Sequence, residues 1–270
     1  MRDTTSPTCA LTIAGSDSGG GAGIQADLKT FAAHRVHGLS AIAALTAQHT
    51  RGVTAVDVPS LDFLRAQIDA CFDDFEIGAV KLGMLANAGV IGVVAEALES
   101  RKPPFVILDP VMVATSGAKL LEESALDALR TRLLPLASVV TPNLPEAELL
   151  LGHAIPTLAD MHAAANELLS LGAASIFLKG GHLLDDGDVV DLFADYSGIR
   201  QVAHPRLRIE AHGTGCTLAS AIAANLCLGL PLAEACAAAS DYVHDALRKG
   251  YRPGRSEIVV LDHFRAAPSP

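Results

Sequence analysis

Two glycine-rich turns carry the residues whose types and spacing point to chemistry. The first, Gly15–Asp27, follows an apolar run and has four glycines within five residues. Because glycine has no side chain, such a backbone can approach a ligand closely. The second turn, His212–Thr217, precedes a segment with apolar residues at helical spacing. Amides at a helix N-terminus bind anions, so Gly213, Thr214 and Gly215 are predicted to hold a transferring phosphoryl group.

The first glycine turn matches no familiar phosphate motif completely. A Walker A loop needs a lysine, and no Lys or Arg lies between Gly15 and Asp27. The run Gly21–Ala26 fits the loose dinucleotide pattern G-x-G-x-x-A. However, the next apolar run ends at Gln48, without the acidic residue that would hold a ribose. A simple turn before a helix stays open as an alternative.

Cys216 stands in the second glycine turn. A thiol at a helix N-terminus gains thiolate character, which suits proton transfer. The alternative is a small buried apolar side chain, the usual place of a free cysteine. We adopt that alternative for Cys9, Cys71, Cys227 and Cys236, and expect function for Cys216 because of its Gly-Thr-Gly context.

Six short apolar runs are predicted to be strands, and amphipathic segments between them to be helices. The runs are apolar on both faces, which is typical of a buried parallel sheet. The fold expected is therefore α/β, with a mostly parallel central sheet flanked by helices on both faces, in one domain over residues 1–270. Residues 189–203 are expected to form short strands outside this alternation. The predicted strands are Leu11–Ala14, Leu39–Leu45, Ala79–Leu82, Phe105–Leu108, Ser138–Val140 and Ser175–Leu178.

Two leucine-rich patterns illustrate the predicted helices. Apolar residues recur at helical spacing from Leu61 to Phe75, with Ser60 as the N-cap. The pattern repeats at Leu126, Leu129 and Leu133.

Polar residues follow the predicted strands one after another. In open parallel sheets, ligands bind at the carboxyl edge, so these residues predict the rim of an active site. They are Ser16, Asp17, Gln48, Met84, Asp109, Thr141, Asn143, Glu146 and Lys179.

Composition excludes several classes of function. The net charge is −10, which argues against nucleic acid as a ligand because nucleic-acid binding needs a concentrated basic surface. No apolar stretch reaches the roughly 18 uncharged residues that would span a bilayer, and the first residues do not form a signal peptide. Five cysteines without CxxC spacing indicate reduced thiols in the cytoplasm.

Together the two glycine turns resemble those of the ribokinase-like superfamily. The match is close to its hydroxymethylpyrimidine and phosphomethylpyrimidine kinases of thiamine biosynthesis. This resemblance implies a ribokinase-like fold, ATP and Mg²⁺ as cofactors, a small pyrimidine as substrate and a homodimer. The stretches that carry it are Ala14–Phe31, Ala44–Thr50, Lys81–Leu85, Leu108–Met112, Leu133–Glu146, Leu178–His182 and His212–Ser220.

The resemblance also implies which residues meet the substrate. Asp27 and Gln48 would grip the ring nitrogens and amino group of the pyrimidine. Gly15 would lie at its edge, and Met84 and Val111 would pack near it. Cys216 would stand beside the hydroxymethyl oxygen as the candidate base, where sugar kinases of the superfamily carry Asp. Alternatively, Asp27 is a solvated side chain or a partner of its helix dipole.

At the nucleotide end, the resemblance implies an Asn-x-x-Glu motif at Asn143 and Glu146 that organises magnesium around the phosphates. Asp109 would assist, and Lys179 would neutralise phosphate charge, with Thr214 beside the nucleotide. A pure capping role is the alternative for Asn143 and Glu146, because their spacing is that of an N-cap and its N3 partner.

Two departures from the family pattern touch this rim: His49 replaces the usual Asn, and Glu210-Ala211 replaces the usual Asn-Thr. The nearest rival function is a pyridoxal or pyridoxine kinase of the same superfamily. A non-catalytic ligand sensor on this fold is a rival of another class, and a dehydrogenase is the weakest rival.

Overall fold

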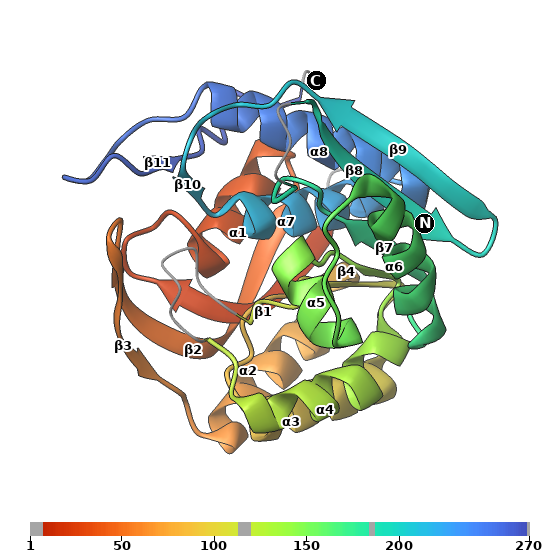
Figure 1. Cartoon of the computed structure of the whole chain (residues 1–270). Coiled ribbons are helices and arrows are strands. Elements are labelled where there is room, and N and C mark those ends of the chain that lie inside the picture. The colour runs from red at the N-terminus through yellow and green to blue at the C-terminus, as the bar shows by residue number, and fades with distance from the viewer. Residues whose placement is uncertain (1–7, 113–119, 184–186, 269–270) are drawn as a thin grey trace.

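A large mixed sheet forms the centre of the molecule (Figure 1). The computed structural model describes residues 8–112, 120–183 and 187–268. The strand order is β3-β2-β1-β4-β5-β6-β7-β8-β9, with β2, β1, β4, β5, β6 and β7 parallel and β3, β8 and β9 antiparallel to their neighbours. The strands are β1 Cys9–Asp17, β2 His37–His49, β3 Gly52–Asp57, β4 Ile77–Leu82, β5 Phe105–Leu108, β6 Val139–Val140, β7 Ser175–Leu178, β8 Val189–Asp195 and β9 Gly198–His204.

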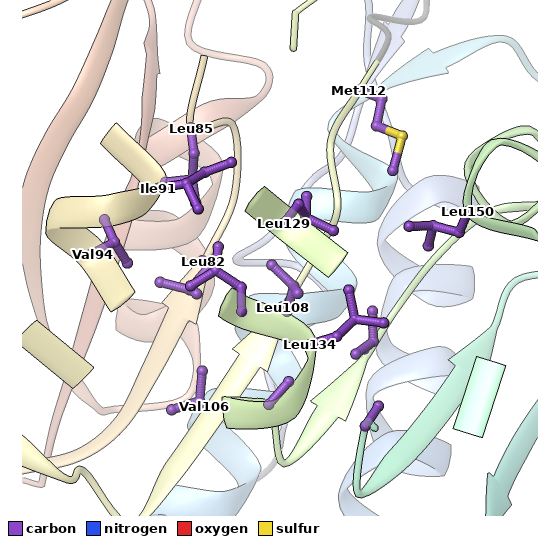
Figure 2. Packing of buried hydrophobic residues seen from close by; sticks show 14 of the residues in the cluster. Leu82, Leu85, Ile91, Val94, Val106, Leu108, Met112, Leu129, Leu134 and Leu150 are labelled. Carbon is purple, nitrogen blue, oxygen red and sulfur yellow. The ribbon is translucent and has the colours of Figure 1, made fainter. Parts of the chain in front are cut away.

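Helices cover both faces of this sheet. Alternate residues of a strand point to opposite faces, so Val80 of β4 joins one apolar cluster and Ala79 joins the other. On the first face, Leu82 and Leu108 pack with Ile91 and Leu129 (Figure 2). That face carries α2 Leu61–Asp74, α3 Ala88–Arg101, α5 Leu144–Leu151 and α6 Leu158–Ser170, and the other carries α1 Gly23–Ala33, α7 Thr214–Cys227 and α8 Leu232–Arg248.

The predicted strands and fold class are confirmed. All six apolar runs form parallel strands, and β1 and β2 continue several residues beyond the predicted bounds. Helix α2 begins after Ser60, whose side chain accepts a hydrogen bond from the amide of Phe63 at 3.3 Å. The leucine repeat is less regular than predicted. After the 3₁₀ turn η1 Glu123–Ala125 come the short α4 Leu126–Ala128, the π-helical turn η2 Leu129–Leu133 and the 3₁₀ turn η3 Leu134–Leu136.

The short strands expected within residues 189–203 form as the hairpin β8–β9, which extends the central sheet beyond β7 in antiparallel pairing. Strand β3 was not predicted. Because most of its side chains are exposed and β2 alone pairs with it, it lacks the apolar pattern by which the other strands are detected.

A small parallel pair lies beside the second glycine turn. Strand β10, Ala211–His212, pairs with β11, Val259–Val260, and Tyr251 exchanges two backbone hydrogen bonds with Val260 at 3.0 and 2.9 Å. The chain then brings His263 Nε2 to 3.1 Å from Thr217 Oγ1 in the first turn of α7. The C-terminal segment thus holds the start of α7 in place.

No helix among residues 8–112, 120–183 and 187–268 is both long and apolar enough to cross a membrane.

Candidate active site

A cavity of ≈ 1160 Å³ opens at the carboxyl ends of the parallel strands. Its position agrees with the predicted rim, because β1 and β4 lie next to each other while the chain passes from β1 to β2 on the other side, which is a topological switch point. Nearly all predicted site residues line it: Gly15, Gln48, Met84, Asp109, Val111, Asn143, Glu146, Lys179, Gly213, Thr214, Gly215 and Cys216.

The first glycine turn is filled by a carboxylate of its own chain. Asp17, which is buried, accepts hydrogen bonds from the amides of Gly19, Gly21 and Ala22 at 2.7, 2.9 and 2.8 Å. A side chain at Gly23, whose φ is +56°, would collide with the carbonyl of Gly15. The amides that could hold a phosphate are therefore occupied, which argues against the dinucleotide interpretation and makes this turn a wall of the cavity.

The second glycine turn presents unoccupied amides. Gly213 is the N-cap of α7 with φ +83°, and no side chain caps this helix end. A Cβ at Gly215 would lie 3.1 Å from Lys179 Nζ, so the turn packs directly against that lysine. The first amides of α7 have no intrahelical partner and face the same part of the cavity as the lysine charge. This arrangement suits an anion.

Lys179 is paired with two carboxylates. Its Nζ lies 3.1 Å from Asp109 Oδ1 and 3.9 Å from Glu146 Oε2, and Thr141 donates to Asp109 at 3.2 Å. Burial opposes the charge of Lys179, but the two carboxylates outweigh it and raise its pKa. Burial, together with the charge of Asp109, raises the pKa of Glu146 to about 7. Protonation of Glu146 is therefore sensitive to pH near neutrality.

Asn143 and Glu146 form the capping box that was the alternative to a metal role. The Asn143 side chain accepts a hydrogen bond from the backbone N–H of Glu146 at 2.9 Å, and the Glu146 carboxylate accepts one from the backbone N–H of Asn143 at 2.8 Å. Capping uses only part of the Glu146 carboxylate, which also faces Lys179. No group of three or more His, Cys, Asp or Glu side chains in the described segments could hold a metal alone. Asp109 and Glu146 nonetheless suit Mg²⁺, which commonly uses one or two carboxylates and completes its shell with phosphates and water.

Cys216 lies in the first turn of α7, on the cavity wall. The expected gain of thiolate character is wrong for the ligand-free protein. Burial raises the pKa of Cys216 to about 11, and the opposing charge of Lys81 does not compensate. The side chain is therefore a neutral thiol at pH 7.

Asp27 does not contact the cavity, which corrects its predicted grip on the ring. Its carboxylate is fully buried, with Lys81 Nζ at 2.9 and 3.0 Å, Thr12 Oγ1 at 2.6 Å and Ser220 Oγ at 2.7 Å. The alternatives of a solvated side chain or a helix-dipole partner are also excluded. Asp27 instead holds Lys81, a fully buried residue that is among those lining the cavity.

Lys81 is a candidate functional residue that the sequence argument missed. A lysine inside the otherwise apolar strand β4 was the available signal, because a buried lysine is rare unless it is paired.

The opposite end of the cavity is lined by Gly15, Gln48, Met84 and Val111, as predicted. Met84 packs on Gly15, because a Cβ added at Gly15 would lie 3.0 Å from the Sδ atom of Met84. Val111 packs against the small apolar cluster that contains Met84. An apolar wall with one fixed amide suits a flat polar ring.

A further part of the cavity was not predicted. His182, an exposed turn residue after β7, lines it near Lys179. Asp191, which also lines it, is buried and accepts from the Gly180 amide and from Ser240 Oγ, both at 2.9 Å. Asp191 lies on β8 and Ser240 on α8, and only the folded sheet reveals that β8 lies beside β7. The two departures from the family pattern leave the strands around the cavity intact. His49 is the last residue of β2, and Glu210-Ala211 runs into β10.

Comparison with known proteins gives a consistent result. The family model described as phosphomethylpyrimidine kinase matches residues 17–260. The chain is 52% identical over 242 residues to a hydroxymethylpyrimidine/phosphomethylpyrimidine kinase of Rhizobium meliloti, covering 88% of this chain and 90% of that protein. It is 48% identical over 258 residues to the thiamine biosynthesis bifunctional protein ThiED of Geobacter sulfurreducens, covering 95% of this chain and 52% of that longer protein. The solved structure of an ADP complex of Bacillus subtilis pyridoxal kinase is similar with a TM-score of 0.88 and 34% identity, covering 96% of this chain and 98% of that one.

Proposed function

The chain belongs to the phosphomethylpyrimidine kinase family, and we propose on that basis that it phosphorylates 4-amino-5-hydroxymethyl-2-methylpyrimidine with ATP. It then phosphorylates the monophosphate to the diphosphate, in thiamine biosynthesis. The observation that supports this best is the division of one cavity into an end with Gln48 and Met84 and an end with Lys179 and the amides of α7. Cys216 lies between the two ends, because the backbone amide of Gly23 donates to its sulfur and the charge of Asp109 also acts on it. A ring and a nucleotide phosphate would therefore meet there.

The residues around Cys216 would act mainly by position and charge. Phosphoryl transfer passes through a loose transition state in most analyses, which leaves little covalent work for the protein. The α7 amides and Lys179 would stabilise charge on the transferred group. Mg²⁺, when bound at Glu146 and Asp109, would neutralise phosphate charge. Cys216, a thiol in the free protein, would orient the hydroxymethyl oxygen. It could receive the hydroxyl proton only as the thiolate, after its own proton has gone to solvent.

The decisive experiment is product analysis by mass after incubation with MgATP and the hydroxymethylpyrimidine. We expect species with one and two added phosphoryl groups. A single addition would limit the function to the first step, and no addition would overturn the proposal. Tight binding without turnover would support the ligand sensor instead, whereas ATP hydrolysis that depends on the added pyrimidine would exclude it.

Pyridoxal phosphorylation is the second candidate, because a solved pyridoxal kinase shares this fold over 96% of the chain. Both substrates carry a hydroxymethyl group on an aromatic nitrogen heterocycle. An assay of the two compounds side by side separates the candidates, and we expect a larger kcat/KM for the pyrimidine.

We further propose that the chain acts as one catalytic domain in a cytoplasmic homodimer. All five cysteines lie in the described segments and are free thiols, which suits a reducing compartment. A groove between β2 and α2 carries the exposed side chains of Leu45 and Phe63, the latter 61% exposed, beside the edge strand β3. A second copy of the chain would cover this apolar surface. Sedimentation should give a dimer mass, and Phe63→Glu should give the monomer.

A further inference from the structure

We propose that Thr46 fixes the side-chain amide of Gln48 so that the amide oxygen faces the cavity, which selects a ring with an N–H donor at that place. Thr46 would be a positioning residue that acts through Gln48. The inference rests on the proposed function, because Gln48 is taken there as the residue that meets the pyrimidine.

The backbone of Gln48 is held by the first glycine turn. Ser18 Oγ donates a hydrogen bond to the backbone carbonyl of Gln48 at 2.8 Å and accepts one from the backbone N–H of Gln48, also at 2.8 Å. The pairing of β2 with β3 shifts register between Ala47 and Gln48. The regular pairing of the two strands is therefore interrupted at Gln48. With the main chain fixed at both its donor and its acceptor, the remaining freedom of Gln48 lies in its side chain.

Thr46 settles which atom of the side-chain amide faces which way. Its Oγ1 lies 2.9 Å from the carbonyl oxygen of Ser16 and 3.1 Å from the amide atom of Gln48 that is assigned as Oε1. A hydroxyl has one hydrogen, and a carbonyl can only accept. If the hydrogen went to Gln48, the oxygens of Thr46 and Ser16 would face each other at 2.9 Å without a proton between them.

The hydrogen of Thr46 therefore belongs to the Ser16 carbonyl, and the hydroxyl presents a lone pair to Gln48. The Gln48 atom at 3.1 Å is then the donor Nε2. Oxygen and nitrogen of an amide have nearly the same shape and are told apart by their hydrogen bonds, so this assignment needs no movement of neighbouring atoms. The oxygen Oε1 is left for the cavity, which Gln48 lines.

The consequence is a polar filter for the ring. Within the described residues no group is bonded to the second amide atom of Gln48. Gln48 is half-buried, and a ring seated against it would cover its oxygen. An acceptor that a ligand covers and leaves unpaired is costly, so a ring with an amino group is favoured over an isosteric ring with a carbonyl oxygen. The aminopyrimidine carries its amino group next to the hydroxymethyl-bearing carbon. Pyridoxal carries an aldehyde, an acceptor, at the equivalent position.

The test compares Thr46→Val, which has the same shape without a hydroxyl, with Thr46→Ser, which keeps the hydroxyl. Each is assayed with the 4-amino ring and with 5-hydroxymethyl-2-methylpyrimidin-4-one, both with MgATP. We expect Thr46→Val to raise KM for the amino ring about tenfold with kcat nearly retained, and to reduce the preference for amino over oxo by a similar factor. Thr46→Ser should restore the wild-type preference.

Gln48→Glu provides a second test if Thr46→Val folds poorly, as judged by its urea midpoint. A carboxylate offers only acceptors, so this variant should still prefer the amino ring to the oxo ring. A reversed preference in Gln48→Glu, or an unchanged preference in folded Thr46→Val, would overturn the inference. If the wild type phosphorylates neither ring, the proposed function fails and takes the inference with it. If the wild type phosphorylates the amino ring and Thr46→Val keeps its preference, the inference alone fails.

Discussion

Lys81 Nζ lies 2.9 Å from Asp27 Oδ2, and neither side chain has any exposed surface. The pair joins β4 to α1, and Lys81 also lines the ligand cavity. Burial opposes the charge of Lys81, but the carboxylate of Asp27 overcomes this and raises the pKa of the lysine. With hydroxyls from Thr12 and Ser220 also donating to Asp27, each oxygen of the carboxylate is satisfied.

Removing one member of this pair should destabilise the protein strongly. Asp27→Asn or Lys81→Met leaves a buried charge without its partner, and we expect a loss of about 3–5 kcal/mol in the free energy of unfolding. Urea denaturation measures it. Arg65→Met is the matched control, because Arg65 and Asp69 form a pair of similar length, 3.1 Å, at the surface. Equal losses in the buried and the surface variants would contradict the role given to burial.

The thiol of Cys216 should react slowly at neutral pH. Because its pKa is raised to about 11, its alkylation rate by iodoacetamide should rise about tenfold for each pH unit between pH 7 and 10. Peptide mass mapping follows the label at Cys216 itself, with free N-acetylcysteine as the reference thiol. A rate that levels off below pH 9 would show that the α7 terminus overcomes the effect of burial.

Cys216→Ala should keep the fold and ligand binding and lower kcat by about a hundredfold or more, if the thiolate form of Cys216 takes the hydroxymethyl proton. Calorimetric binding of the pyrimidine and the urea midpoint check that only turnover has changed. Near-normal turnover would reject Cys216 as the proton acceptor and leave it as a neighbour of the anion site.

Glu146 should make stability depend on pH in the range between its ordinary pKa of 4.5 and its folded pKa of about 7. Within that range the folded state binds more protons than the unfolded state, so stability falls as pH rises. The Glu146→Gln variant keeps an acceptor for the capping box but lacks the titration. Without nucleotide or Mg²⁺, it should match the wild type near pH 4.5 and exceed it by about 3 kcal/mol at pH 8.5. Melting temperatures measured against pH report the difference. If the wild type and Glu146→Gln gave parallel profiles, the raised pKa of Glu146 would be refuted.

Asp17 should be needed for the shape of the first glycine turn. Asp17→Ala leaves the amides of Gly19, Gly21 and Ala22 without their acceptor, so we expect a loss of about 2–3 kcal/mol in stability. KM for the pyrimidine should rise more than KM for ATP, because Ser18 in the same turn holds Gln48. Steady-state kinetics with each substrate varied checks this. The exposed Asp127, which lines neither the cavity nor the groove of Leu45 and Phe63, gives the control variant Asp127→Ala, which should change neither quantity.

The sheet and its rim could be predicted because they depend on local and periodic signals. Buried parallel strands are continuous apolar runs, and the polar residue after each run marks the carboxyl edge. Gln48, Asp109 and Lys179 were placed at the cavity by this rule alone, and the structure confirms their positions.

Other features depend on contacts between distant segments, which no local pattern encodes. Nothing near Asp27 in the sequence reveals Lys81, which lies 54 positions away, or Ser220, which lies 193 positions away. The direction of the Cys216 pKa was mispredicted for the same reason: the helix end was visible in the sequence, and the depth of burial was not. The first glycine turn was expected to bring its backbone close to a ligand, but an aspartate within the turn binds three of its amides.

The pairing of β10 with β11 has a consequence for biosynthesis. The residues that precede the second glycine turn find their strand partners only at Val259 and Val260. A ribosome-bound chain that has exposed both glycine turns, the sheet and Lys179 still lacks the strand that fixes the start of α7. Catalytic competence should therefore appear late and abruptly during translation, after the rest of the cavity has been assembled.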